Sequence, residues 1–265
     1  MKFVKLTPEQ KKYYELGVRD AEQVQEYEKR SASRIKALAE SKQRNNVFNA
    51  NDTHVLVVVD MQYDFVDGVL GTPEARAVVP NVVARIERFR KENPNGIIIA
   101  TRDFHDMKHI GCPDEFANIP THCCSFEGSQ IVSPILEALG EDCVYCDPCG
   151  IGEQIDKGVT TIICDKNIFA AEDIIHNCLY SYGLKIYKDI PRKETPKDID
   201  GFFTVEFVGV CTDVCVISSA IALQTYPHND THIVVDASCC AGTTPEKHKA
   251  ALEVMKSLCM EVINE

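Results

Sequence analysis

The stretch FVGVCTDVCV, from Phe207 to Val216, decides the fold. Its first half is an apolar, β-branched run typical of a buried strand, and a helical pattern begins at about Thr212. Two cysteines, Cys211 and Cys215, stand where the two patterns meet. Their sulfurs could form a metal clip or a disulfide, fill the core, or attack a substrate, and the rest of the chain must decide between these alternatives.

The same alternation of apolar runs and amphipathic helices continues on both sides of this stretch. It predicts a three-layer open parallel sheet with helices on both faces. The predicted strands are His54–Asp60, Gly96–Arg102, Gly158–Asp165, Thr204–Val210 and Thr231–Asp236, with a further edge strand at Leu184–Ile190. The predicted helices are Pro73–Lys91, Ala171–Tyr182, Thr212–Thr225 and Thr244–Cys259.

The first 50 residues follow a different pattern. Thr7-Pro8-Glu9-Gln10 is typical of a helix start, and a charged helical segment with a weak apolar stripe follows. We therefore expect an N-terminal helical arm over 1–50 and one α/β domain over 51–265. The arm would pack on this domain or on a neighbouring subunit, and we expect a homo-oligomer. Residues 183–203 are charged and resemble an inserted loop.

Composition excludes several classes of partner. The 265-residue chain carries a formal net charge of −12, which disfavours binding to nucleic acid or to anionic membranes. No stretch approaches the roughly 18 apolar residues of a membrane span, and the first residues lack the apolar core of a signal peptide. We therefore expect a cytoplasmic protein whose partner is a small molecule.

Thirteen cysteines are many for such a chain, but the count is odd, so a disulfide framework is disfavoured. The densest cluster is Cys143, Cys146 and Cys149. Three sulfurs at this tight spacing fall short of the four ligands of a structural zinc site, so a surface turn with incidental thiols is favoured over a metal knuckle.

Polar side chains follow four of the predicted strands at the point where each strand ends. They are Asp60, Asp103 with His105, Lys166, and the turn from Cys211 to Cys215. Taken singly, each has a structural explanation, such as a turn, a cap or a core position. Ligands of open α/β sheets bind beyond the carboxyl ends of the strands, so we expect these side chains to meet in one crevice.

An acid, an amine and a thiol in one crevice suit nucleophilic catalysis. A helix N-terminus and a nearby ammonium, here that of Lys166, both favour the thiolate of Cys215. Asp60 could take the thiol proton and later return it to a leaving amine. The backbone amides of Cys211 and Cys215 could stabilise the oxyanion of a tetrahedral intermediate.

Four motifs together resemble the isochorismatase-like cysteine hydrolases, and among them the nicotinamidases. They are VLVVVDMQYDF at Val55–Phe65, ATRDFH at Ala100–His105, the lysine of CDKNIF at Lys166, and VGVCTDVCV at Val208–Val216. The resemblance spans about Thr53 to Ile263 and leaves out the arm. It implies that Cys215 is the nucleophile and that a cis Val210–Cys211 peptide directs the Cys211 amide into the oxyanion hole. A redox pair of Cys211 and Cys215 is disfavoured, because a fixed turn leaves little freedom for disulfide geometry.

The resemblance also implies a metal site and a ring pocket. Asp103 and His105 match the ligands at the strand end of nicotinamidases, and His122 of IPTHCCSFEGSQ matches their later histidine. Such a set suits a divalent Zn, Fe or Mn ion. His109 could be a fourth ligand or an exposed histidine. Phe65 and Phe169 would line the pocket for the substrate ring, with the pyridine nitrogen on the metal.

The resemblance therefore implies an amidohydrolase of linear C–N bonds that converts nicotinamide to nicotinate and ammonia, a reaction of NAD salvage. The sequence departs from the nicotinamidase pattern after His122, after Lys166 and in the 183–203 insertion, which leaves the substrate open. Another superfamily hydrolase, acting on a carbamoyl, ureido or isochorismate-type substrate, is the first alternative. A non-catalytic binding member is the second.

Overall fold

The computed structural model describes residues 54–105, 113–187, 203–225 and 231–265. The expected helical arm, His109 and most of the 183–203 insertion lie outside the described residues. The division into an arm and an α/β domain therefore stays a prediction.

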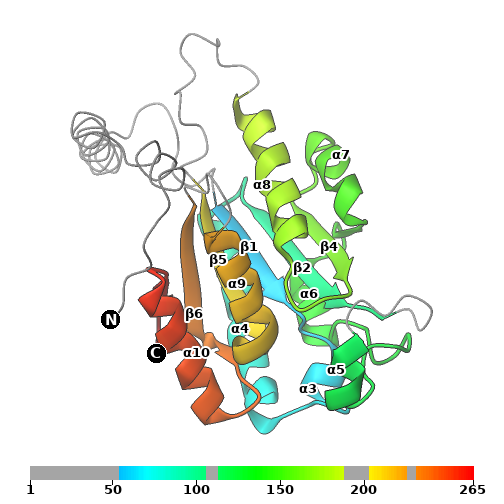
Figure 1. Ribbon diagram of the computed structural model, residues 1–265. Helices are drawn as coiled ribbons and strands as arrows, with labels where there is room; N and C mark the ends of the chain where they lie inside the picture. Colours follow the sequence, from blue (N-terminus) through cyan, green and yellow to red (C-terminus); the bar gives the residue numbers. More distant parts are fainter. Residues whose placement is uncertain (1–53, 106–112, 188–202, 226–230) are drawn as a thin grey trace, which may run out of the picture. The chain divides into compact units, whose positions relative to one another are not determined.

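The described residues form one seven-stranded parallel sheet (Figure 1). Its order is β3-β4-β2-β1-β5-β6-β7, so the first strand in the chain lies at the centre. The strands are β1 His54–Val59, β2 Ile97–Asp103, β3 Val144–Tyr145, β4 Thr161–Lys166, β5 Thr204–Val210, β6 His232–Ala241 and β7 Glu261–Ile263. This is the predicted α/β class with an open parallel sheet.

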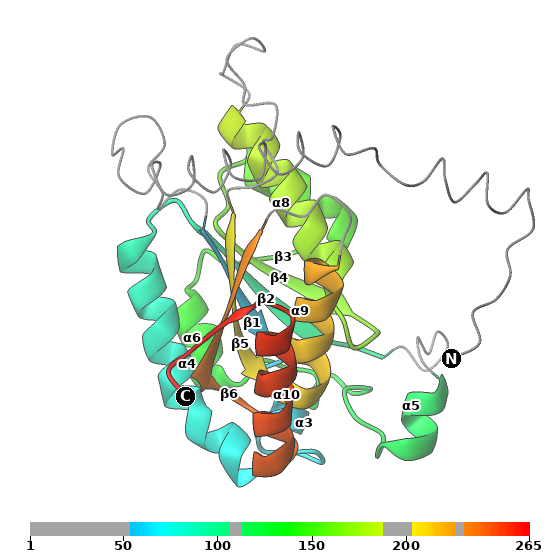
Figure 2. The same ribbon diagram turned by 60° about the vertical axis from the view of Figure 1, so that its left-hand side comes forward.

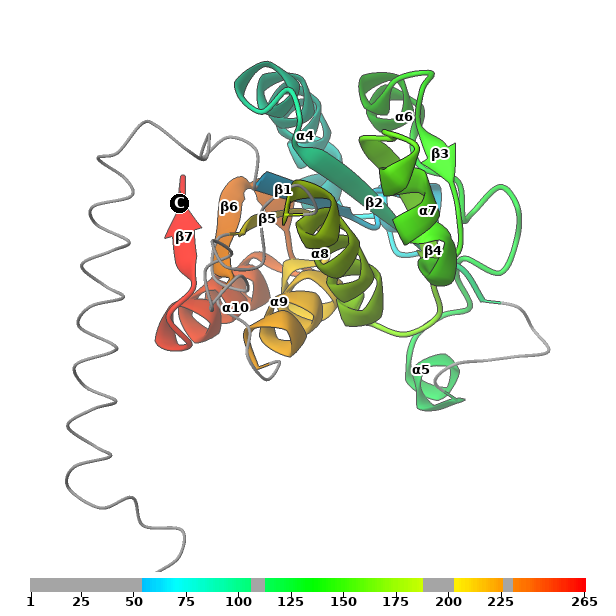
Figure 3. The same cartoon turned by 90° about the horizontal axis from the view of Figure 1, so that it is seen from above.

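Helices cover both faces of the sheet, as the view from above shows (Figure 3). On one face lie α4 Pro73–Glu92 and α6 Ser133–Leu139, and on the other lie α7 Ile151–Asp156, α8 Glu172–Tyr187, α9 Ile217–Gln224 and α10 Pro245–Ser257. Two short helices, α3 Tyr63–Val66 and α5 Pro113–Asn118, lie near the carboxyl edge of the sheet (Figure 2). Short 3₁₀ and π turns, η2 Pro148–Gly150 and η4 Thr212–Val216, complete the described elements.

Alternate residues of each central strand supply two separate cores. In β1, Val55 and Val57 pack on the side of α8 and α9, whereas Leu56 and Val58 pack on the side of α4 and α6. Since both faces of a parallel sheet are covered, its strands read as continuous apolar runs. This burial is what made the central strands predictable from their composition.

Helix starts follow standard capping chemistry. The Thr72 hydroxyl accepts a hydrogen bond from Ala75 N ahead of Pro73, and the Thr244 hydroxyl accepts one from Lys247 N ahead of Pro245. Each threonine satisfies one backbone amide that the first helical turn would leave without a partner. No helix among the described residues has both the length and the apolar character needed to cross a bilayer.

Three details differ from the sequence expectation. The edge strand expected at Leu184–Ile190 is wrong, because 184–187 continue helix α8. A short apolar segment fits a strand or a buried helix equally well, and here the preceding helix continues to Tyr187. Strands β3 and β7 were not predicted, since two or three residues carry too little pattern, and β6 runs to Ala241 instead of Asp236.

Candidate active site

The four strand ends singled out in the sequence lie side by side. Strands β4, β2, β1 and β5 are consecutive neighbours, and all run in the same direction. Their carboxyl ends carry Lys166, Asp103, Asp60 and the turn that begins at Cys211. The sheet order alone therefore brings residues from distant parts of the chain to one edge, the lower one in Figure 1.

The ammonium of Lys166 is the centre of this group. Its Nζ lies 2.8 Å from Asp60 Oδ2, 3.4 Å from Asp103 Oδ1 and 3.7 Å from Cys215 Sγ, and it donates to Ile168 O at 3.1 Å. Its side chain is 2% exposed, so these contacts replace water almost completely. The structure thus brings together all three residues to which we assign catalytic roles from the sequence.

Asp60 is held from two sides. Thr101 Oγ1 donates to Asp60 Oδ1 at 2.7 Å and accepts from Asp60 N at 3.2 Å. The backbone of Asp60 has a φ of 47°, a left-handed conformation that turns the chain out of β1. On the neighbouring strand, a Cβ on Gly209 would lie only 2.1 Å from Val59 O, so only glycine lets β5 approach the end of β1.

The two cysteines of the turn lie in different surroundings. Cys215 is 4% exposed and packs in the core on the side of α8 and α9, whereas Cys211 packs against the core on the side of α4. Both are free thiols, and neither belongs to the one candidate metal group among the described residues. The expected cis peptide is present between Val210 and Cys211. Only Cys215 faces the amine of Lys166.

Burial is the largest influence on the pKa values of both Cys215 and Asp60. Burial raises the pKa of the Cys215 thiol well above its ordinary value, and the carboxylates of Asp60 and Asp103 add to burial, against the opposing effect of Lys166. Lys166 favours the thiolate, as expected from the sequence, but burial outweighs its effect. Burial also raises the pKa of Asp60, although Lys166 partly offsets it.

Beside this group lies a second cluster that could hold a metal. Asp103, His105, Glu115 and His122 are all buried, and each offers a ligand atom within 4.8 Å of the others. His105 Nε2 is 2.9 Å from Asp103 Oδ2, and His122 Nε2 is 3.2 Å from Glu115 Oε1. The three residues implied by the resemblance are brought together, and Glu115 was missed by the sequence reasoning.

The donor set of this cluster fits a divalent cation. Two imidazoles and two carboxylates are ligands that zinc, iron and manganese accept, and Oε2 of Glu115 is buried without a hydrogen-bond partner. Burial opposes protonation of His122, but hydrogen bonds to Asp103 and Glu115 outweigh it and raise its pKa to about 10.

Asp103 belongs to both clusters. Its Oδ1 faces Lys166, and its Oδ2 faces His105 and, at 3.5 Å, His122. Burial opposes ionisation of Asp103, but Lys166 and the two histidines outweigh it and hold the pKa of its carboxyl below its usual range. One carboxylate therefore connects the amine of the first cluster to the histidines of the second.

The aromatic residues expected to line the pocket occupy different environments. Phe65 is 6% exposed, and its ring lies 5.4 Å from that of His122, beside the metal cluster. Phe169 is half-buried and packs against the core on the side of α8. Asp64, next to Phe65, accepts a hydrogen bond from Cys123 N at 2.7 Å. This bond connects α3 to the segment that carries His122.

The cysteine cluster of the sequence does not form a metal group in the described residues. Cys146 continues the pairing of β3 with β4, since its amide donates to Ile163 O at 3.1 Å. Cys143 is half-buried and Cys149 is exposed, and all three are free thiols.

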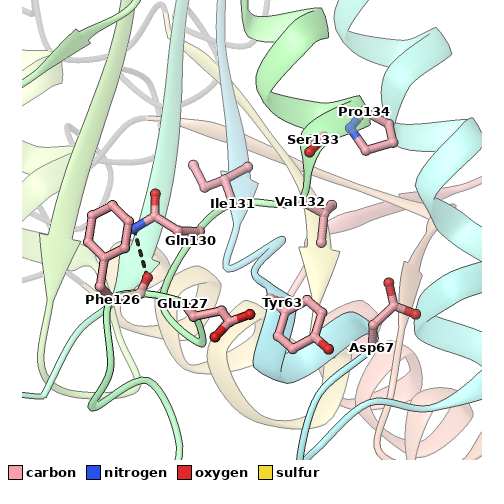
Figure 4. Close-up of a pocket in the computed structure, with 9 residues that line it drawn as sticks. All are labelled: Tyr63, Asp67, Phe126, Glu127, Gln130, Ile131, Val132, Ser133 and Pro134. Atoms are coloured by element: carbon pink, nitrogen blue, oxygen red, sulfur yellow. Dashed lines mark hydrogen bonds between the residues drawn. The ribbon is translucent and has the colours of Figure 1, made fainter.

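Figure 4 shows a surface hollow of about 610 Å³. It is lined by residues of α3, of the loop before α6 and of the start of α6: Tyr63, Asp67, Phe126, Glu127, Gln130, Ile131, Val132, Ser133 and Pro134. None of these residues belongs to either cluster. The residues singled out in the sequence therefore lie at the carboxyl edge of the sheet and do not line this hollow.

Comparisons with known proteins agree with the motifs. The model of the Isochorismatase domain family matches residues 195–265. A nicotinamidase/pyrazinamidase of Bacillus subtilis aligns at a TM-score of 0.56 and 19% identity, over 80% of this chain and 100% of that one. A pyrazinamidase of Pyrococcus horikoshii, in complex with zinc, aligns at 0.53 and 25% identity, over 80% and 99%.

A protein of L. infantum in complex with nicotinate aligns at a TM-score of 0.56 and 18% identity, over 82% of this chain and 96% of that one. Among curated protein sequences, none matches this chain. The fold is that of solved nicotinamidases and isochorismatase-like hydrolases, and the family model supports the resemblance to this superfamily over residues 195–265.

The charges around Cys215 predict how fast its thiol is alkylated. Because its pKa is raised, alkylation by iodoacetamide should keep accelerating as the pH rises above neutral, without an early plateau. At neutral pH, Asp60→Asn should react several-fold faster than the wild type, since it removes a carboxylate that disfavours the thiolate, and Lys166→Met several-fold slower. Peptide mapping by mass spectrometry isolates Cys215 from the other thiols. A plateau below neutral pH, or equal rates in the two variants, would contradict this picture.

Proposed function

We propose that the protein is a cysteine-dependent amidohydrolase that acts on a small carboxamide, most directly nicotinamide, and releases nicotinate and ammonia. The observation that carries the proposal is the single buried amine of Lys166, which contacts a carboxylate and a thiol while Asp103 links it to a candidate metal cluster. Solved nicotinamidases and pyrazinamidases with the same fold support the choice of substrate.

In the first half of the reaction, Sγ of Cys215 attacks the carboxamide carbon. Asp60 takes the thiol proton, and its raised pKa makes it a better proton acceptor than an ordinary aspartate. The amides of Cys211 and Cys215 stabilise the oxyanion. When the C–N bond breaks, Asp60 protonates the nitrogen and ammonia leaves, so that a thioester remains on Cys215.

In the second half, Asp60 is again a carboxylate and removes a proton from water, which attacks the thioester carbon. The C–S bond breaks, the proton held by Asp60 returns to the sulfur of Cys215, and the product leaves as a carboxylic acid that loses its own proton to bulk water. Lys166 stays an ammonium throughout, because its carboxylate neighbours raise its pKa well above its ordinary value despite burial. It stabilises whichever of Asp60 and Cys215 carries the negative charge.

The metal cluster takes the role of holding and orienting the substrate. Asp103, His105, Glu115 and His122 would hold a divalent ion, which supplies a Lewis acid for a ring nitrogen of the substrate and offsets the charge of the two carboxylates. Phe65, packed against His122, would form one wall of the ring pocket, and Phe169 the other.

The alternatives differ in substrate and in chemistry. Another hydrolase of the superfamily would use the same cysteine on a carbamoyl, ureido or isochorismate-type compound, and the family model over 195–265 supports this class as well. A superfamily member that only binds its ligand would release no product from any of these compounds. A panel of amides with ammonia detection therefore separates both from a nicotinamidase.

The two cysteines of one turn provide a matched test. Cys215→Ala should lower ammonia release from nicotinamide by about 10⁴-fold or more, because the reacting sulfur is gone. Cys211→Ala should keep activity within about threefold, because only the backbone amide of Cys211 is assigned to the reaction. Ammonia and nicotinate are measured together. Equal activity of wild type and Cys215→Ala would remove the nucleophile assignment.

The metal proposal is tested by elemental analysis. The wild type should copurify with a stoichiometric divalent transition metal, and Glu115→Gln and Asp103→Asn should bind about 10-fold more weakly or worse, since each loses a charged ligand. His232→Gln is the control, because His232 pairs with Glu261 at the exposed start of β6. Full activity of a metal-free protein would favour a metal-independent relative over a nicotinamidase.

A further inference from the structure

Gln62 is a buried amide side chain with contacts to the main chain of Asp103. Its side chain is 0% exposed and lies two residues after Asp60. Asp103 N donates to Gln62 Oε1 at 2.7 Å, and Gln62 Nε2 donates to Asp103 O at 2.7 Å. A further contact from Nε2 reaches Ser129 O at 2.9 Å. Both donor hydrogens and the acceptor oxygen of the Gln62 side chain thus have hydrogen-bond partners.

These bonds continue the sheet where its own pairing stops. Paired residues of β1 and β2 run only to Val58 and Ala100, before the ends that carry the functional groups. Beyond that point, the amide of Gln62 pairs with both polar atoms of the Asp103 main chain, as a neighbouring strand would. Because Gln62 and Asp60 belong to one short segment, the bonds also fix the spacing between the Asp60 and Asp103 carboxylates.

That spacing matters because both carboxylates contact one amine. Asp60 lies 2.8 Å and Asp103 3.4 Å from Lys166 Nζ, while the other oxygen of Asp103 faces His105. If the main chain of Asp103 rotated or shifted, its carboxylate would lose contact with the two histidines, with the amine of Lys166, or with both. Groups that orient metal ligands typically alter metal affinity or activity by 10–100-fold when removed.

We infer that Gln62 is a positioning residue that holds the Asp103 carboxylate between Lys166 and the histidine cluster. The inference rests on the proposed function, since it takes Asp103 as a metal ligand. It assigns Gln62 a role through Asp103 and no contact with the substrate. A merely structural role would change stability and leave the geometry of the metal cluster unaltered.

Cobalt binding to the metal-free full-length protein tests this directly. Gln62→Met keeps the length of the side chain and removes all its hydrogen bonds to Asp103 and Ser129. We expect it to weaken cobalt affinity by about 10–100-fold, measured by competition with a chelator, and to change the visible cobalt spectrum, which reports ligand geometry. Gln62→Glu keeps the acceptor for Asp103 N but loses both donors, and it serves as the second variant should Gln62→Met fail to fold.

Asn93→Ala is the matched control. Asn93 is another buried side-chain amide, at the end of α4 just before β2 begins, and so at the opposite edge of the sheet. Its loss should lower stability in thermal unfolding but leave cobalt affinity within about twofold and the spectrum unchanged, because distant sites act independently.

The outcomes separate this inference from the proposed function. Three results would each overturn the role of Gln62. The first is cobalt affinity and a spectrum equal to those of the wild type in both Gln62 variants, the second is an equal loss of cobalt affinity in Asn93→Ala, and the third is a wild type that binds no cobalt. Ammonia release from nicotinamide is measured on the same samples. If the Gln62 variants lose cobalt affinity but the wild type releases no ammonia, the role of Gln62 is upheld and the nicotinamidase function is excluded.

Discussion

The ammonium of Lys166, buried at the carboxyl edge of the sheet, is the constraint on which the site depends. An ammonium out of water costs several kcal/mol unless charges and hydrogen bonds replace its hydration. Asp60, Asp103 and the carbonyl of Ile168 supply them here. Because the same amine lies 3.7 Å from Cys215 Sγ, one buried charge connects the thiol, the Asp60 carboxylate and the candidate metal cluster.

Parallel pairing makes this unit possible. The register of β2 against β4 pairs Asp103 with Lys166. The register of β1 against β5 ends at the pair Val59 and Gly209, so Asp60 and the turn that begins at Cys211 both come directly after the last paired residues. The raised pKa values of Asp60 and Cys215 follow from the same burial. Burial thus favours the protonated thiol of Cys215, whereas Lys166 favours its thiolate.

Much of this arrangement could be predicted from the sequence. Continuous apolar runs located the five longer strands, and the rule that ligands gather at the carboxyl ends of parallel strands linked Asp60, Lys166 and Cys215. Glu115 could not be found, because a single acidic residue in the short helix α5 follows no pattern, and Gln62 acts through a main chain 41 residues away. The high pKa of Cys215 also escaped prediction, since burial depends on packing that spacing alone does not reveal.

The most direct test of the account is whether the thiol beside Lys166 adds to a substrate-like carbonyl. Nicotinaldehyde labelled with ¹³C at its carbonyl, followed by NMR, reports a tetrahedral thiohemiacetal carbon that is distinct from an imine. The account predicts this signal in the wild type and in Cys211→Ala, and its loss in Cys215→Ala. A wild type without the signal, or a Cys215→Ala variant that retains it, would contradict the account.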